Sequence, residues 1–201
     1  MKFFGPKKTI SSRGPSYYDR ENLVHTMKDL ISIYFPKGKT VQNTDETIMF
    51  NDLKLSEINE KKLSGVFGVA DYVISGPENI NDYRVYFYRH SIGKFNYLMQ
   101  FHFCKKNFLF VNNMVRSSYV LSSEEKKIIL LRFKEKYYAD LDFDHSKGFD
   151  LQIVDQNNNF FYTIDDVNFS ISYINNSNYF KEIIDNFKSS KNPIDNNQFL
   201  L

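Results

Sequence analysis

The chain has few of the residues that build cross-linked or membrane-spanning proteins. Cys104 is its single cysteine, so it can form neither an internal disulfide nor a zinc site based on paired cysteines. Its apolar runs are short, as at Ile128–Leu131, whereas a membrane-spanning helix needs about 20 apolar residues. Tryptophan is absent, and Ala70 and Ala139 are the only alanines. These absences exclude disulfide-rich scaffolds and argue against an integral membrane protein.

The chain also lacks a strong excess of charge of one sign. Its 26 Lys and Arg residues nearly balance 24 Asp and Glu residues, which argues against a nucleic-acid coat protein. The 21 asparagines and 17 isoleucines are typical of an AT-rich bacterial or phage genome. Aromatic residues make up 17% of the chain, so we expect it to fold. Residues 1–20 lack the apolar segment of a secretory signal, and we expect a cytoplasmic protein.

The residue pattern divides the chain into three parts. Residues 1–19 combine Gly, Pro, Ser and Lys without an apolar period and predict a flexible basic arm. Residues 20–138 predict an α+β core, and residues 139–201 an acidic C-terminal subdomain packed on it. Residues 137–201 carry a net charge of −6, against +8 for the rest. The predicted fold class is α+β, a three-stranded antiparallel meander packed by helices, with a smaller acidic α+β C-terminal subdomain.

The meander is predicted over residues 83–115, where two short breaks separate three aromatic-rich runs. If both breaks are tight turns, Tyr86 pairs with Met99 across the first and Leu109 with Phe103 across the second. Side chains that alternate along a strand share one face. We therefore expect the core face of the middle strand to consist of Phe95, Tyr97, Met99, Phe101 and Phe103.

Apolar residues at helical spacing predict four helices. Asp19 is expected to cap the first helix, and Ser122 and Glu125 form a capping box for the third. The C-terminal part adds a hairpin turn at 155–159 and a strand over 169–174. The predicted helices span residues 20–35, 56–67, 122–138 and 178–188.

Motifs of known chemistry are incomplete in this sequence. The phosphate-loop fragment at 37–40 lacks the glycine that must precede it by five residues. The alternating aspartates within 140–144 resemble a cation site, but they fail the spacing of a calcium-binding loop. Cys104 and His102 share a strand face, and we interpret Cys104 as a buried structural residue. We therefore predict no enzyme activity, no catalytic residue, no metal and no cofactor.

The second face of the meander is the main functional candidate. An apolar patch with polar residues at its rim is typical of a partner site. We predict a non-catalytic cytosolic protein-binding module, by class-level analogy with small α+β antidotes and phage-encoded inhibitors. Two alternatives are cover by the C-terminal hairpin or helix of the same chain, and cover by a second copy in a homodimer. The predicted partner-binding residues are Phe87, Leu98, Gln100, His102 and Phe110.

Basic and aromatic residues also mix along the N-terminal two-thirds of the chain. Single-stranded nucleic acid binds surfaces on which bases stack against aromatic rings beside positive charge. A single-stranded nucleic-acid-binding protein is therefore the alternative function. We expect no membrane partner, because residues 1–19 lack an amphipathic stripe.

Overall fold

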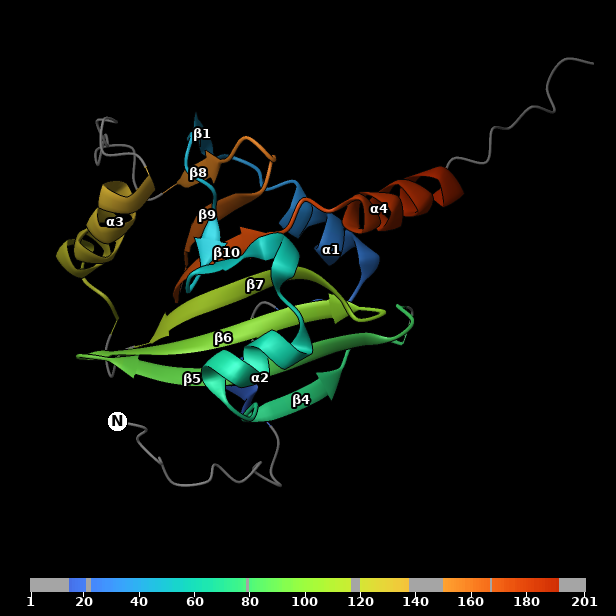
Figure 1. Ribbon diagram of the computed structural model, residues 1–201, viewed down its shortest axis with the longest axis horizontal. Helices are drawn as coiled ribbons and strands as arrows, with labels where there is room; N and C mark the ends of the chain where they lie inside the picture. Colours follow the sequence, from blue (N-terminus) through green and yellow to red (C-terminus); the bar gives the residue numbers. More distant parts are fainter. Residues whose placement is uncertain are drawn as a thin grey trace, which may run out of the picture.

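The computed structural model describes residues 15–20, 23–78, 80–116, 120–137, 150–166 and 168–191. One large sheet organises these residues. Its strands are β1 (Thr40–Asn43), β4 (Tyr72–Ser75), β5 (Tyr83–Ile92), β6 (Phe95–Cys104), β7 (Asn107–Arg116), β8 (Leu151–Val154), β9 (Phe160–Asp165) and β10 (Phe169–Ile174). They lie in the order β1-β8-β9-β10-β7-β6-β5-β4 (Figure 1). β1 is parallel to β8, and all other neighbours are antiparallel.

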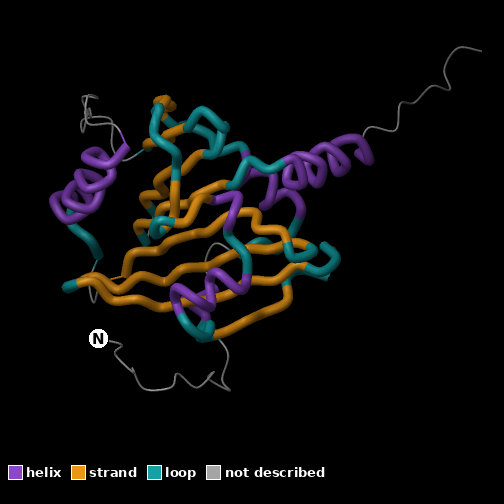
Figure 2. Tube along the Cα trace, in the orientation of Figure 1, coloured by secondary structure: helices purple, strands orange, loops and turns teal. Residues whose placement is uncertain are grey.

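Helices and a small hairpin surround this sheet (Figure 2). The α-helices of the described ranges are α1 (Met27–Tyr34), α2 (Glu60–Phe67), α3 (Ser123–Tyr137) and α4 (Asn178–Lys191). Short 3₁₀ turns occur at η1 (Tyr17–Arg20) and η2 (Leu55–Glu57), and β2 (Met49–Phe50) pairs with β3 (Leu53–Lys54). α3 stands at one end of the sheet, on the left of Figure 1. No helix within the described ranges is both long enough and apolar enough to cross a membrane.

The α+β class is confirmed, but the sheet is larger than the sequence predicted. The three expected strands are β5, β6 and β7, and they form part of an eight-stranded sheet. β10 pairs with β7 along six residues, so the C-terminal strands continue the same sheet. The meander and the C-terminal strands are therefore joined by backbone hydrogen bonds, which a smaller packed subdomain would not require.

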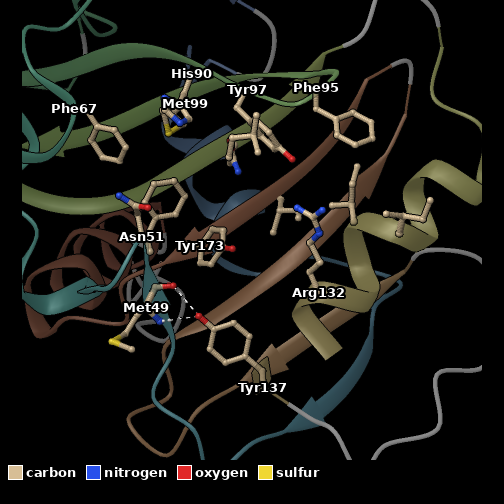
Figure 3. Close-up of a pocket in the computed structure, with 16 residues that line it drawn as sticks. Met49, Asn51, Phe67, His90, Phe95, Tyr97, Met99, Arg132, Tyr137 and Tyr173 are labelled. Atoms are coloured by element: carbon tan, nitrogen blue, oxygen red, sulfur yellow. Dashed lines mark hydrogen bonds between the residues drawn. The ribbon is translucent and has the colours of Figure 1, made fainter. Parts of the chain in front are cut away.

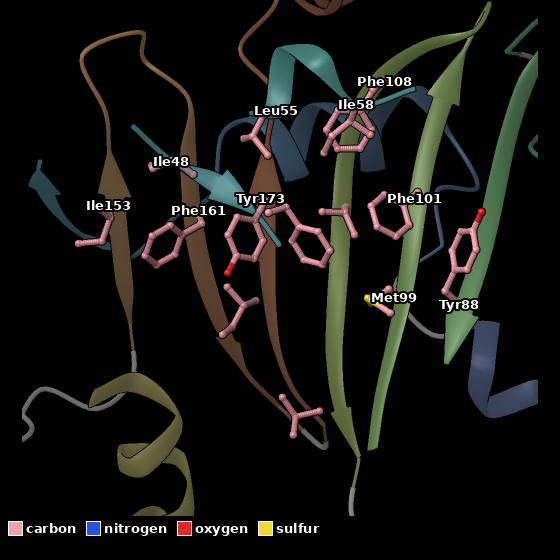
Figure 4. Packing of buried hydrophobic residues seen from close by; sticks show 14 of the residues in the cluster. Ile48, Leu55, Ile58, Tyr88, Met99, Phe101, Phe108, Ile153, Phe161 and Tyr173 are labelled. Carbon is pink, nitrogen blue, oxygen red and sulfur yellow. The ribbon is translucent and has the colours of Figure 1, made fainter. Parts of the chain in front are cut away.

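The first face of the sheet carries the larger apolar core (Figure 4). The β2–β3 hairpin inserts Phe50 against this face, with ring centroids 5.3 Å from Phe101 and 5.0 Å from Tyr173. Both contacts are edge-to-face, the arrangement that aromatic quadrupoles favour. Leu55 and Ile58 cover neighbouring rings from the η2 segment. Part of the predicted core face of β6, including Phe101, is thus confirmed as buried.

The second face is covered by helices from the two ends of the described chain. Leu30 of α1 and Phe180 and Ile184 of α4 are almost fully buried in this second cluster. Tyr34 of α1 lies 4.8 Å from Phe180 and 6.1 Å from Phe160 of β9, measured between ring centroids. Both faces of the sheet are therefore packed, which explains why its strands are apolar on both sides.

The register of the meander differs from the prediction at two places. The first hairpin turns at Gly93, with φ of 58°, so Tyr86 pairs with Phe101 rather than Met99. This two-residue shift keeps every side chain on its predicted face. The second hairpin has a bulge, because Phe103 pairs with Phe108 and the pairing shifts at His102. Leu109 is consequently buried with the second face, not opposite Phe103.

Local signals placed the starts of α3 and α4, whereas α1 and α2 begin later than predicted. Glu125 N donates to Ser122 Oγ at 3.3 Å, and Ser122 N donates to Glu125 Oε2 at 3.0 Å, so the predicted capping box is confirmed. The prediction that Asp19 caps the first helix is wrong. α1 begins later, with Thr26 as its N-cap and Asp29 completing a capping box. Asp155 closes the predicted turn at 155–159 by accepting hydrogen bonds from two backbone amides within it.

Three predicted features fall outside the described residues. They are most of the basic arm, the aspartates within 140–144, and the end of the acidic C-terminal part after Lys191.

Candidate functional site

The five predicted partner-binding residues lie in the protein interior. None of their side chains is more than 1% exposed. Residues of α1 and α4 belong to the same buried cluster, and η1 contacts Gln100, so the hypothesis that this face is bare is wrong. The cover comes from the same chain, and the C-terminal helix supplies only part of it. The apolar members belong to the second-face cluster: Phe87, Leu98 and Phe110.

Gln100, the fourth predicted residue, is part of a buried hydrogen-bond ladder across the strands. Its Nε2 donates to the Asp19 carbonyl at 2.7 Å, and its Oε1 accepts from Asn112 Nδ2 at 3.3 Å. Ser172 Oγ donates to Asn112 Oδ1 at 3.4 Å. The Asp19 carboxylate pairs with Arg89 at 2.5 Å. The side-chain amide of Gln100, which sequence reasoning assigned to a partner, is therefore satisfied within the chain, where it helps fix strand register.

His102, the fifth predicted residue, is fully buried between Tyr83 and Phe110. Its Nδ1 lies 2.9 Å from the Tyr83 hydroxyl, and its ring stacks on Phe110 with centroids 4.0 Å apart. Its Nε2 has no partner among the described residues. Burial lowers the pKa of His102 to about 3, so the imidazole is neutral at physiological pH. Nearby Cys104 is also buried and accepts a hydrogen bond from the Tyr179 hydroxyl at 3.4 Å.

The accessible site lies on the opposite face, in a cleft between α3 and the end of the sheet (Figure 3). Its volume is about 300 Å³, at the lower end of the range for small-molecule sites. Aromatic and aliphatic side chains form most of its wall, and Ile92 and Ile128 stand half exposed at its rim. The lining residues are Met49, Phe50, Asn51, Phe67, His90, Ile92, Phe95, Tyr97, Met99, Asn113, Ile128, Ile129, Arg132, Tyr137, Ile171 and Tyr173.

Two polar side chains in this cleft lack the partners that such groups normally have. Asn113 of β7 lines it, and its buried Oδ1 accepts no hydrogen bond in the described part of the chain. Arg132 extends from α3 toward the cleft, on the side opposite Phe95 and Tyr97, and forms no ion pair with a described residue (Figure 3). Burial raises the pKa of Tyr97, and the positive charge of Arg132 opposes that rise, which places this charge close to the cleft wall.

Specific contacts fix α3 above the cleft. Lys94, in the β5–β6 turn, pairs with Glu125 in the first turn of α3 at 2.5 Å. Lys126 pairs with Asp165 of β9 at 2.6 Å. At the other end of α3, the Tyr137 hydroxyl donates to the Met49 carbonyl at 2.9 Å, drawn as a dashed line in Figure 3. Contacts at both ends of α3 therefore hold this helix against the sheet, and they fix the walls of the cleft.

Sequence reasoning missed this cleft, although two of its polar residues carried a signal. Asn113 occupies a position on β7 where alternation with Val111 and Val115 predicts an inward side chain. Arg132 interrupts an apolar stretch on the helix face near Ile129. A polar residue at an inward position is informative, because an unsatisfied buried polar group is costly.

The described residues give less support to nucleic-acid binding and to metal binding. Among the basic residues of the aromatic strands and their turns, which a nucleic acid would contact, Arg84, Arg89 and Lys94 each pair with a carboxylate. No cluster of three or more metal-ligating side chains occurs within the described ranges. The chain matches no protein-family model, and neither a curated protein nor a solved structure shows significant similarity to it.

Proposed function

We propose that this protein acts by binding rather than by catalysis, and that its binding site is the cleft between α3 and the sheet. The observation that carries the proposal is an open apolar cleft of about 300 Å³. It contains a guanidinium and an amide oxygen that have no ion-pair or hydrogen-bond partner among the described residues. An aromatic wall with a few converging polar groups is the usual composition of a ligand site.

A binding role also agrees with the chemistry available at the cleft. Its polar groups are phenols, amides, His90 and Arg132. General acid–base catalysis needs a side chain that is oriented toward the substrate, and this set of groups supports binding more directly than proton transfer. The apolar and aromatic composition of the strands had suggested a protein partner. A cleft of this size accepts one or two side chains of a partner protein, or one small molecule.

An uncharged fluorescent probe, phenylnaphthylamine, tests the proposal because its emission rises in apolar surroundings. We expect saturable binding to the wild-type protein at one site. Ile128→Glu places a charge at the cleft rim and is expected to weaken binding by about tenfold or more, since the desolvation of that charge costs at least about 1.4 kcal/mol. Leu131→Glu is the matched control, because Leu131 is equally exposed on α3 and does not line the cleft.

The proposal fails if the wild-type protein shows no saturable binding, or if both variants lose binding equally. The nucleic-acid alternative has a separate test. Retardation of a single-stranded oligonucleotide at low salt, with affinity falling steeply as salt rises, would support it over the cleft.

A further inference from the structure

We propose that the occupant of the cleft is a small amphipathic anion, with an aromatic or branched apolar body and one carboxylate or similar group held by Arg132. This inference rests on the proposed function, because it names the ligand class for the same cleft.

The apolar body follows from the wall of the cleft. Phe50, Phe67, Phe95 and Tyr173 line it together with aliphatic side chains from the sheet and α3. Aromatic side chains offer their faces and edges to a planar ligand, and burial of apolar area supplies most of the affinity. The enclosed volume favours a compact molecule over an extended chain.

The anionic group follows from the charges around the cleft. Two lysines and two acidic residues at α3 and its neighbours are already neutralised, in the pairs Lys94–Glu125 and Lys126–Asp165. Arg132 lacks such a partner within the described ranges, and its guanidinium offers several donors in one plane. A guanidinium binds a carboxylate through charge-assisted hydrogen bonds, which are stronger than neutral ones.

Asn113 adds a second polar contact at the cleft. Its Oδ1 accepts no hydrogen bond within the described ranges, and an unsatisfied buried acceptor is unfavourable. Rotation of the amide about its Cβ–Cγ bond exchanges the positions of the oxygen and the nitrogen. Asn113 can therefore receive a donor group of the ligand, or donate to its anionic group. Because Asn113 can act as an acceptor, the ligand can carry a hydroxyl or amino substituent that donates to it.

A pair of probes with closely similar aromatic bodies separates charge recognition from apolar binding. Anilinonaphthalenesulfonate carries an anionic sulfonate, and phenylnaphthylamine is uncharged. We expect Arg132→Gln to weaken binding of the anionic probe by about tenfold, the value of one charge-assisted hydrogen bond, and to leave the uncharged probe unchanged. Arg132→Lys should keep most of the preference for the anion. Lys127→Gln removes the same charge from the same helix outside the cleft and should have no effect.

The possible outcomes distinguish the proposal of a binding cleft from the proposal of an anionic ligand. If the uncharged probe binds and Arg132→Gln affects neither probe or both equally, the anion proposal is overturned while the binding cleft stands. If neither probe binds the wild-type protein, both proposals are overturned. Sedimentation that shows a dimer dissociated by Ile128→Glu would assign the cleft to a second copy of the chain and overturn the small-anion proposal. Circular dichroism of each variant verifies that the fold is retained.

Discussion

The buried His102 predicts a pH dependence of stability that can be calculated from the structure. Its imidazole is fully buried beside Tyr83 and Phe110, and burial lowers its pKa to about 3. In the unfolded chain the same group has a pKa of about 6.5. The unfolded state therefore binds more protons than the folded state between these two values. The contribution of His102 is fully present above about pH 6.5 and decreases as the pH falls toward 3.

The size of this effect follows from proton linkage. A single proton taken up on unfolding changes the free energy of unfolding by about 1.4 kcal/mol per pH unit. From pH 7 to pH 5 the wild-type protein should lose about 2 kcal/mol through His102 alone. Protonation of carboxylates with ordinary or lowered pKa values contributes mainly below this interval. The variants described next separate His102 from the other histidines of the chain.

Urea unfolding at pH 7, 6 and 5 measures this loss. In His102→Asn the side chain does not titrate, and its amide can still pair with the Tyr83 hydroxyl. We expect this variant to be less stable than wild type at pH 7 and nearly independent of pH down to 5. His25→Asn removes an exposed histidine and should retain the wild-type slope. Equal slopes in wild type and His102→Asn would refute the assignment of the effect to His102.

Two further predictions test the packing. The double variant Phe87→Glu/Phe110→Glu should lose its folded circular dichroism spectrum, because two buried unpaired charges cost several kcal/mol; a folded, monomeric variant would contradict cover of this face by α1 and α4. Ser122→Ala removes the cap of α3 and should lower the free energy of unfolding in urea by about 1 kcal/mol. Ser189→Ala, near the end of α4, is its control, and an equal effect in both variants would contradict the capping argument.

Several features encoded by neighbouring residues could be predicted from the sequence, although the capping box of α1 at Thr26 and Asp29 was missed. The cap of α3 needs only Ser122 and Glu125, three positions apart, and the turn at Asp155 needs only the residues that follow it. Strict alternation likewise identified β6 as a strand and divided its side chains correctly between two faces. These signals depend on the local geometry of a helix or strand, so tertiary structure did not alter them.

Features encoded by distant segments could not be predicted in the same way. The second face of the meander is apolar whether a partner, a second copy or α4 covers it, so Phe87 and Phe110 give the same pattern in each case. The pairing of β10 with β7 joins segments that are far apart in the chain. The bulge at Leu109 arises from the pairing of two strands, and leucine at that position is not a residue type that predicts a bulge.

The position of the cleft follows from unequal strand lengths. β5 and β6 each contain ten residues, but β4 pairs with β5 only from Arg84 to Phe87. The rest of the β5–β6 hairpin, with His90, Ile92, Phe95 and Tyr97, therefore extends past its edge neighbour. α3 is tied to this extension through Lys94, and the cleft lies beneath it. A sheet packed on both faces leaves accessible apolar surface chiefly where its strands end unequally, which explains why the candidate site lies at this end of the sheet and not on the buried second face.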